Sequence, residues 1–500
     1  MLETAVAQLL FAYSMVTGRR CSLWAVETFA RAARATRHEF GKIGAEGVAM
    51  VQGPTLDAET GRELQLRRFR TQAKRAARET TYYARLFTTL GVDPARLSWD
   101  ELLKLPLTPK DAVRDDGGAF VRRGAQPYLR ATTTGTTGKP TSICFSSYEM
   151  RLYAALQAIY ALTNDEMQED DLLQLSTAAR GLLGNLTTIA ACAHIGATVF
   201  QTGIVDPAFA LAQLAETHHI PGKTTQVTNL STSPSYLGIL TAAGLAHGYT
   251  PADFGLREIT AGGEIVTAGA QRRCQQLFGN VKVTQGFGMT EIWPMSGRLC
   301  EAGHLHWEWA QGLIEVVHPE SGAPVQDGEF GVIVATPFMP FRETTILLRF
   351  NTEDTVRAVQ HPACSLKHLP ATGNVQGKLR LCVRHAQGWT TPRDVLEAVE
   401  EIDAIPLPGR CSFWAHEDGI AVACLVPRDT PELRGALGSA LAARGVPLRE
   451  LVLVTHAHAL RNPLPLRGDL REITFDGTSL SSGQAASPGN DWPATVDHRQ

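Results

Sequence analysis

A loop rich in hydroxyl groups and glycines, at residues 132–141, is the segment of this chain best suited to bind phosphate. Its sequence, Thr-Thr-Thr-Gly-Thr-Thr-Gly-Lys-Pro-Thr, offers a polyphosphate backbone N–H groups, short hydroxyl donors and one cation. The loop differs from the Walker A motif, because Thr133 stands where that motif needs glycine and Pro140 follows the lysine. Glycine loses extra entropy on ordering, so a simple surface turn of this composition would be costly. The residues expected to bind phosphate are Thr133, Thr134, Gly135, Thr136, Thr137, Gly138 and Lys139.

A second motif lies at residues 285–291, with the sequence Gln-Gly-Phe-Gly-Met-Thr-Glu. It follows an apolar run at residues 281–284 that we expect to be a strand, and its glycines predict a turn at the end of that strand. There an aromatic ring could stack on a base, a hydroxyl could contact phosphate, and a carboxylate could bind Mg²⁺. Taken alone, the pattern is also that of an ordinary strand-to-helix turn.

A third motif, at residues 348–355, reads Leu-Arg-Phe-Asn-Thr-Glu-Asp-Thr and precedes a Gly377-Lys378 pair. Asp354 is a carboxylate that could accept hydrogen bonds from both hydroxyls of a ribose. In their order and spacing, the three motifs resemble those of the adenylate-forming (acyl-activating) enzymes. In that family, ATP and a carboxylate give an acyl-adenylate and pyrophosphate.

The resemblance covers roughly residues 78–475 and is strongest to the phenylacetate–CoA ligase branch. The segments that fit this branch are 80–87, 107–110, 303–308 and 388–392. The resemblance implies a large N-terminal domain followed by a small mobile C-terminal domain. It also implies an ATP- and Mg²⁺-dependent ligase that activates an aryl or arylacetic acid through acyl-AMP, releases pyrophosphate and then transfers the acyl group to CoA.

Roles for individual residues follow from the same resemblance. The residues expected to be catalytic are Lys139, Thr290, Glu291 and Arg467. Glu291 would hold Mg²⁺, and Asp354 would bind the ribose. The other residues expected at the nucleotide are Gly263, Glu264, Gln285, Gly286, Phe287, Gly288 and Lys378. The residues expected to line the acid pocket are Tyr236, Gly262 and Phe287.

The chain departs from the family pattern at two positions. Lys378 stands for an arginine at the domain hinge, which keeps the charge but loses the bidentate fork. Asp469 stands for the lysine that reaches the acyl and phosphate oxygens during adenylation. A carboxylate there would repel developing phosphate charge, and losing one such contact typically costs about 10²–10³ in rate. Arg467 or Arg471 could supply the charge instead.

These departures leave two alternatives open. One is a specialised-metabolism ligase that passes its adenylate to an amine, a carrier protein or another nucleophile, including ATP-dependent diazotisation of an aryl amine with nitrite. The other is a catalytically lapsed nucleotide-binding or partner-binding protein. The second is disfavoured because Lys139, Glu291 and Asp354 are all retained.

A separate group of metal-ligand residue types comprises two cysteines and three histidines. Cys300 and His306 are followed about 55 residues later by His361 and Cys364, a plausible spacing for a closed structural Zn²⁺ site. His304 lies between the first two. Unrelated thiols and surface histidines explain the pattern almost as well, so zinc is an expectation with the ligands Cys300, His306, His361 and Cys364.

Composition limits the classes of partner. The chain has 500 residues with 44% hydrophobic and 19% charged content, as expected for a globular protein with more than one core. A net charge of −3 provides no basic field for nucleic acid. Nine scattered cysteines favour a reducing compartment. The apolar residues 5–16 are too short for a membrane span and follow an acidic residue. We therefore expect a cytoplasmic protein without nucleic-acid or membrane partners, and leave a homodimer open.

Hydrophobic periodicity predicts an α/β fold. The expected units are a helical N-terminal extension (1–77), a large domain of βα units with parallel sheets plus a β-rich part (78–376), a small α+β domain (377–475) and a disordered tail (476–500). Residues 64–86 contain few helix breakers, residues 142–290 alternate helical stretches with apolar runs, and residues 302–358 are strand-rich.

Overall fold

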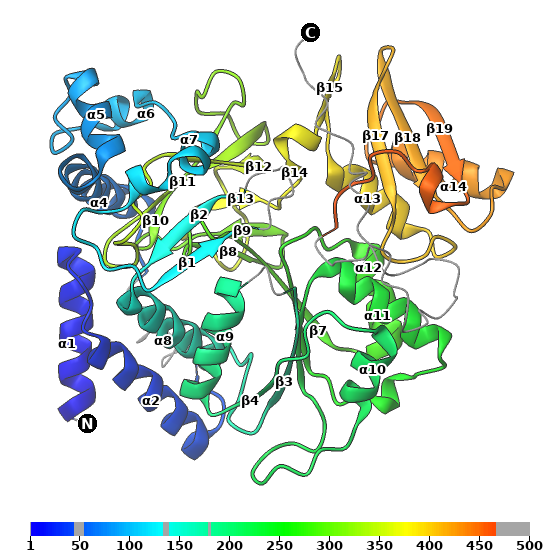
Figure 1. Cartoon of the computed structure of the whole chain (residues 1–500), viewed down its shortest axis with the longest axis horizontal. Coiled ribbons are helices and arrows are strands. Elements are labelled where there is room, and N and C mark those ends of the chain that lie inside the picture. The colour runs from blue at the N-terminus through cyan, green and yellow to red at the C-terminus, as the bar shows by residue number, and fades with distance from the viewer. Residues whose placement is uncertain (1, 45–54, 134–139, 179–181, 467–500) are drawn as a thin grey trace.

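A mixed sheet of 12 strands forms the centre of the molecule, and a small C-terminal unit lies against one side of it (Figure 1). This computed structural model describes residues 2–44, 55–133, 140–178 and 182–466. Five neighbouring strands of the large sheet run parallel and are interleaved with helices, and the other strands are antiparallel. The α/β class expected from the sequence, with βα units followed by a β-rich part, is therefore confirmed.

Up to Phe145, the regular elements of the described residues are helices and one short hairpin. The elements are α1 (Leu2–Thr17), α2 (Leu23–Phe40), α4 (Ala58–Glu79), α5 (Thr81–Leu90), α6 (Trp99–Lys104), α7 (Lys110–Asp115), β1 (Leu129–Thr132) and β2 (Ser142–Phe145). The helical stretch expected at 64–86 is interrupted at Thr80, which has an extended backbone and accepts a hydrogen bond from Tyr83 N to cap α5. Helix α2 packs on α8, so the first helices share the main core of the large domain.

The βα part supplies the parallel half of the sheet. Its elements are α8 (Ser147–Thr163), β3 (Leu172–Ser176), α9 (Leu182–Ile195), β4 (Thr198–Phe200), α10 (Pro207–Ala215), β5 (Asn229–Thr232), α11 (Pro234–Ala246), β6 (Glu258–Gly262), α12 (Ala268–Phe278) and β7 (Lys282–Gly288). Strands β4, β3, β5, β6 and β7 are neighbours in that order and run parallel. A capping box between Ser146 and Glu149 begins α8, which is the sequence signal expected at such a start.

The sheet continues from β7 into its antiparallel half. The strands are β8 (Ser296–Leu299), β9 (His304–His306), β10 (Gly312–Val317), β11 (Phe330–Pro337), β12 (Phe350–Val359), β13 (Ala371–Gly373) and β14 (Gly377–Lys378). Strand β14 pairs with β12 so that Lys378 lies opposite Asp354. Two of the expected site residues are thus neighbours through backbone register, although 24 positions separate them.

The C-terminal unit is a small α+β structure with its own core. Its elements are β15 (Val383–His385), β16 (Gly388–Thr390), α13 (Pro392–Glu401), β17 (Cys411–His416), β18 (Gly419–Leu425), α14 (Pro431–Ala443) and β19 (Leu448–Val454). It docks through α13 on α12, where Arg273 donates hydrogen bonds to the backbone oxygens of Glu400 and Ile405. The contact is close, because a Cβ at Gly269 would lie 2.0 Å from the Glu400 oxygen. In the described part of the chain, no helix is long and apolar enough to cross a bilayer.

Candidate active site

A cavity of about 1860 Å³ collects most of the residues singled out from the sequence. It lies at the carboxyl ends of β5, β6 and β7 and reaches β12, β14 and the C-terminal unit. The expected site residues that line it are Thr133, Gly262, Gly263, Glu264, Gln285, Gly286, Phe287, Gly288, Thr290, Glu291, Cys300, His306, Asp354 and Lys378. Ligands of α/β folds bind at this end of parallel strands.

The phosphate loop connects the strands of the β1–β2 hairpin. Thr133 N donates to the Thr141 oxygen at 2.9 Å, and Thr141 N donates to Thr133 Oγ1 at 3.1 Å, so the two ends of the loop are held together. Residues 134–139 are outside the described part of the chain, and so is Arg467. The roles expected for Thr134, Gly135, Thr136, Thr137, Gly138, Lys139 and Arg467 therefore stay predictions.

The expected turn at residues 285–288 is instead strand. Strand β7 runs to Gly288, and the turn occupies residues 290–294. Phe287 still faces the cavity, in edge contact with Trp307 at 5.8 Å between ring centroids. Next to it, Gly263 has a φ of 92°, which a residue with a Cβ rarely adopts, so the Gly-Gly-Glu segment needs glycine there.

Glu291 is a buried carboxylate that forms an ion pair with Lys110. Its side chain is 1% exposed, and Lys110 Nζ lies 3.2 Å from Oε1. Neither carboxylate oxygen accepts a hydrogen bond from any described residue. A buried carboxylate whose lone pairs accept no hydrogen bond is a suitable oxygen ligand for Mg²⁺. Lys110 in turn places an ammonium group at the wall of the same cavity.

Asp354 and Lys378 form a second ion pair, with 2.7 Å between Oδ2 and Nζ. Thr352 Oγ1 accepts a hydrogen bond from Asp354 N, which fixes the backbone before the pair. Burial lowers the pKa of Lys378 and the nearby Asp354 opposes that shift, so the carboxylate helps to keep the ammonium charged. Lys378 thus orients the carboxylate of Asp354, and Asp354 lines the cavity.

Tyr236 is not part of this cavity, contrary to the expectation for the acid pocket. Its ring is fully buried in the core that α11 forms against β5 and β6. The hydroxyl donates to the Val205 oxygen at 2.6 Å, which satisfies it inside the protein. A large aromatic residue early in a helix is indistinguishable in sequence from a pocket residue, and here packing decided its place.

The comparisons with known proteins agree with this geometry. A family model described as AMP-binding enzyme matches residues 96–336. A phenylacetate-coenzyme A ligase from Thermus thermophilus is 26% identical over 362 residues, which cover 70% of this chain and 78% of that protein. One from Pseudomonas putida is 24% identical over 333 residues, covering 65% and 72%. The chain belongs to the adenylate-forming enzymes.

Solved structures support the fold of this adenylate-forming enzyme. A 2-hydroxyisobutyryl-CoA ligase, in the postadenylation state with 2-HIB-AMP, has a TM-score of 0.67 and 17% identity, and the match covers 83% of this chain and 90% of that one. The same ligase with R3-HIB-AMP gives 0.66 and covers 80% and 87%. The family and the phenylacetate–CoA ligase branch expected from the sequence are confirmed, and the chain is an ATP-dependent, AMP-forming ligase.

Two features of the enzyme's site escaped the sequence reasoning. Lys110 was only part of a segment resembling the branch, and its pairing with Glu291 spans 181 positions that no local pattern connects. The polar residues of β6 and β7 carry a sequence signal of the cavity face. The runs Glu-Ile-Thr-Ala and Lys-Val-Thr-Gln alternate polar and apolar residues where a buried parallel strand is normally apolar throughout.

A Cys/His cluster lies at the β8–β9 hairpin, and two of its members, Cys300 and His306, also line the cavity. Its members are Cys300, His304, His306 and Cys364, whose ligand atoms all lie within 4.8 Å of one another. His304 therefore takes the place expected for His361, which is exposed and contributes no ligand atom to the cluster. The reason is strand pairing, since β9 pairs with the distant β13 and presents alternate residues of its short strand on the same face.

Proposed function

We propose that the enzyme activates an aryl or arylacetic acid through acyl-AMP, releases pyrophosphate and transfers the acyl group to CoA. The observation that carries this proposal is the convergence of two ion pairs, Lys110–Glu291 and Asp354–Lys378, on one cavity with Thr290 and the Gly-Gly-Glu turn. The relatives named phenylacetate-coenzyme A ligase support the acid class and the acceptor.

Each group has a physical role in this proposal. Asp354 accepts hydrogen bonds from the ribose hydroxyls, and the phosphate loop with Lys139 binds the phosphates. The acid's carboxylate attacks the α-phosphorus near Thr290, and the pyrophosphate leaves. Lys110 and Thr290 stabilise the negative charge of the transition state electrostatically. When bound at Glu291, Mg²⁺ would neutralise phosphate charge.

The second half-reaction would use the C-terminal unit. Residues Leu464, Pro465 and Leu466 line the cavity, so the chain reaches the site immediately before Arg467. We infer that this unit turns on the segment around Lys378 to admit the thiol after adenylation. Pyrophosphate release screened over aryl, arylacetic and fatty acids, with product analysis in CoA, amines, carrier protein and nitrite, tests the proposal. An amide, diazo or carrier-bound product would select the corresponding alternative. If none of the acids supports pyrophosphate release, the catalytically lapsed protein would be favoured.

Asp469 should report how the last loop takes part in adenylation. If it marks a lost lysine, Asp469→Lys should raise ATP–pyrophosphate exchange about tenfold or more, the scale of one electrostatic contact. If the site has been rebuilt around Arg467 or Arg471, that change should do little and one Arg→Ala substitution should be damaging. We expect the rebuilt site, because the ion pairs of the ATP site are intact. If Asp469→Lys, Arg467→Ala and Arg471→Ala all leave the exchange rate unchanged, the last loop takes no part in adenylation.

We also propose a structural Zn²⁺ at the Cys/His cluster. In a tetrahedral zinc site the ligand atoms lie about 3.3–3.8 Å apart, and here they are within 4.8 Å. The Nδ1 atoms of His304 and His306 are buried without a hydrogen-bond partner among the described residues, and Cys364 Sγ is 3.1 Å from His306 Nε2. Two thiolates and two imidazoles are a donor set that suits zinc.

Protein purified without added metal should hold about one Zn²⁺ per chain, and removing it should lower the melting temperature. Elemental analysis measures the content. Cys364→Ser should lose the metal, whereas His361→Ala should keep it, because His361 is outside the cluster. Zinc-free protein with an unchanged melting curve would mean that the cluster binds no structural metal.

A further inference from the structure

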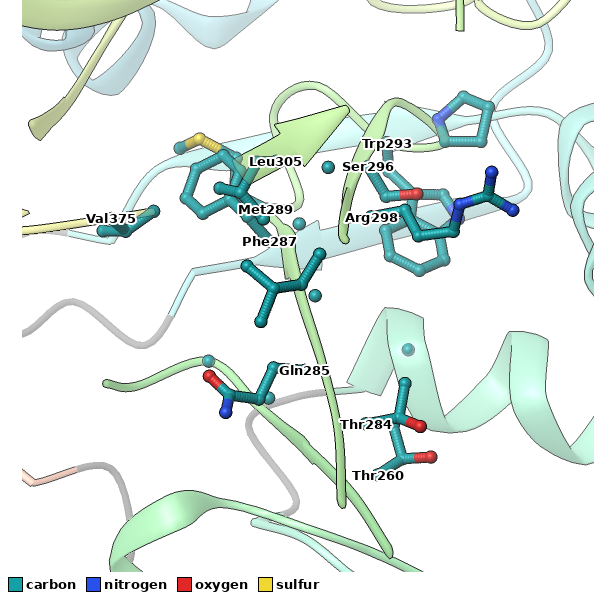
Figure 2. A pocket seen from close by; sticks show the side chains of 18 of the residues that line it. Thr260, Thr284, Gln285, Phe287, Met289, Trp293, Ser296, Arg298, Leu305 and Val375 are labelled. Atoms are coloured by element: carbon teal, nitrogen blue, oxygen red, sulfur yellow. The ribbon is translucent and has the colours of Figure 1, made fainter. Parts of the chain in front are cut away.

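The cavity continues along the sheet beyond the residues assigned to the nucleotide. Strand register places Ser231, Thr260 and Thr284 side by side in one row across β5, β6 and β7. The next row toward the amino ends of the strands contains Asn229, Glu258 and Lys282. All six residues line the cavity, and Figure 2 shows Thr260 and Thr284 below Phe287 on the opposite side of β7 from Gln285.

The polar character of these rows is not required by the fold. On the other face of the same strands, Leu230, Ile259 and Ala261 pack into the core with α11 and α12. Parallel strands covered on both faces are normally apolar on both, because helices bury each side. The cavity face has hydroxyls and charges instead, so this face is built for a polar occupant.

The second row ends in a group of buried hydrogen-bond acceptors, in which two carboxylates lie near the cations of Lys282 and Arg298. Glu258 accepts from Thr284 Oγ1 at 2.6 Å and lies 3.3 Å from Lys282 Nζ. Glu166 is its neighbour: burial, and then the charge of Glu258, raise the pKa of Glu166 to about 7 despite the cations of Lys282 and Arg298. Asn229 is 5% exposed, and its Oδ1 accepts no hydrogen bond from any described residue.

We propose that these two rows bind the far end of the acid substrate, and that this acid carries a protonated amine about 10 Å from its carboxyl carbon. The inference rests on the proposed function, which places the carboxyl at the carboxyl ends of β6 and β7. From Gly262, the row of Thr260 is about 7 Å along the strand and the row of Glu258 about 13 Å, at roughly 3.3 Å per residue. Because a side chain of the second row extends part of the way back toward Gly262, it would contact a substrate group about 10 Å from the carboxyl carbon.

An ammonium group fits what the second row lacks. It donates three hydrogen bonds and accepts none. The row offers Asn229 Oδ1, which accepts no hydrogen bond from any described residue, and the Glu166 carboxylate lies next to the row. Its positive charge would favour the ionised form of Glu166, which burial and Glu258 disfavour. Glu258 beside it already accepts a hydrogen bond from Thr284 and forms an ion pair with Lys282.

Three matched pairs of acids test the inference in ATP–pyrophosphate exchange. The long pairs are 4-(aminomethyl)cinnamate with 4-ethylcinnamate, and 8-aminooctanoate with nonanoate; the short pair is 4-(aminomethyl)benzoate with 4-ethylbenzoate. In each pair an ammonium replaces a methyl group of similar size. We expect kcat/KM to favour the amino member of both long pairs at least tenfold, with a smaller preference in the short pair.

Variants locate the preference. Glu166→Gln should lower the long-pair preference at least tenfold, whereas Glu216→Gln, an exposed carboxylate outside the cavity, should leave it unchanged. Equal or better use of the neutral acids by the wild-type enzyme would overturn the inference and leave the proposed function standing. If no acid supports exchange, the proposed function fails. Calorimetric titration of the same pairs, with a non-hydrolysable ATP analogue present, then decides the inference. The inference is overturned if the amine-bearing acids do not bind, or bind no more tightly than their neutral partners.

Discussion

Glu291→Gln should lower ATP-dependent turnover at least about a hundredfold while the protein remains folded, because the amide cannot neutralise a metal ion or the phosphates around it. The carboxylate is buried, forms an ion pair with Lys110 and accepts no hydrogen bond from a described residue. Initial rates measured as a function of Mg²⁺ concentration check the result, and the variant should need more Mg²⁺ for half-maximal activity.

The ion pair with Lys110 supplies the control for this experiment. Lys110→Met also breaks the pair but leaves the carboxylate, so it should keep the Mg²⁺ dependence of the wild type even where its rate falls. A Glu291→Gln enzyme within about threefold of wild-type activity would show that Glu291 is not the metal ligand.

Asp354→Ala should weaken ATP binding by about 1.5–3 kcal/mol, roughly ten- to a hundredfold in Kd, because two ribose hydroxyls lose a charged acceptor. Calorimetry with ATP and with 2′,3′-dideoxy-ATP isolates the cause. The wild type should prefer ATP, and Asp354→Ala should bind both nucleotides alike.

Lys378→Met is the matched control, since it removes the same ion pair while retaining the carboxylate. It should weaken binding less and still distinguish ATP from the dideoxy nucleotide. If Asp354→Ala kept the wild-type preference for ribose hydroxyls, Asp354 would not be the ribose ligand.

Site motifs that have a distinctive local sequence pattern could be predicted from the sequence. The Gly-Gly-Glu turn, the segment before Glu291 and the strand that carries Asp354 all line the cavity, because each couples a distinctive local pattern to the end of a strand. The parallel direction of strands β3 to β7 was expected in the same way from alternating helical and apolar runs, whereas their order in the sheet was not.

Features set by packing between distant segments could not be predicted. Tyr236 entered the core instead of the cavity, and His304 replaced His361 at the metal-ligand cluster, because strand pairing between β9 and β13 chooses which side chains meet. The pair of Lys110 with Glu291 likewise depends on α7 lying next to the end of β7.

The central claim is that the acid's own carboxylate attacks the α-phosphorus of ATP. An acid adenylated by this enzyme can be supplied with ¹⁸O in both carboxylate oxygens, with CoA present, and the AMP examined by mass spectrometry. Attack through the carboxylate leaves one of its oxygens on the phosphorus, so the account predicts AMP that carries one ¹⁸O atom per turnover, together with unlabelled pyrophosphate. Unlabelled AMP, or formation of ADP and phosphate in its place, would contradict it.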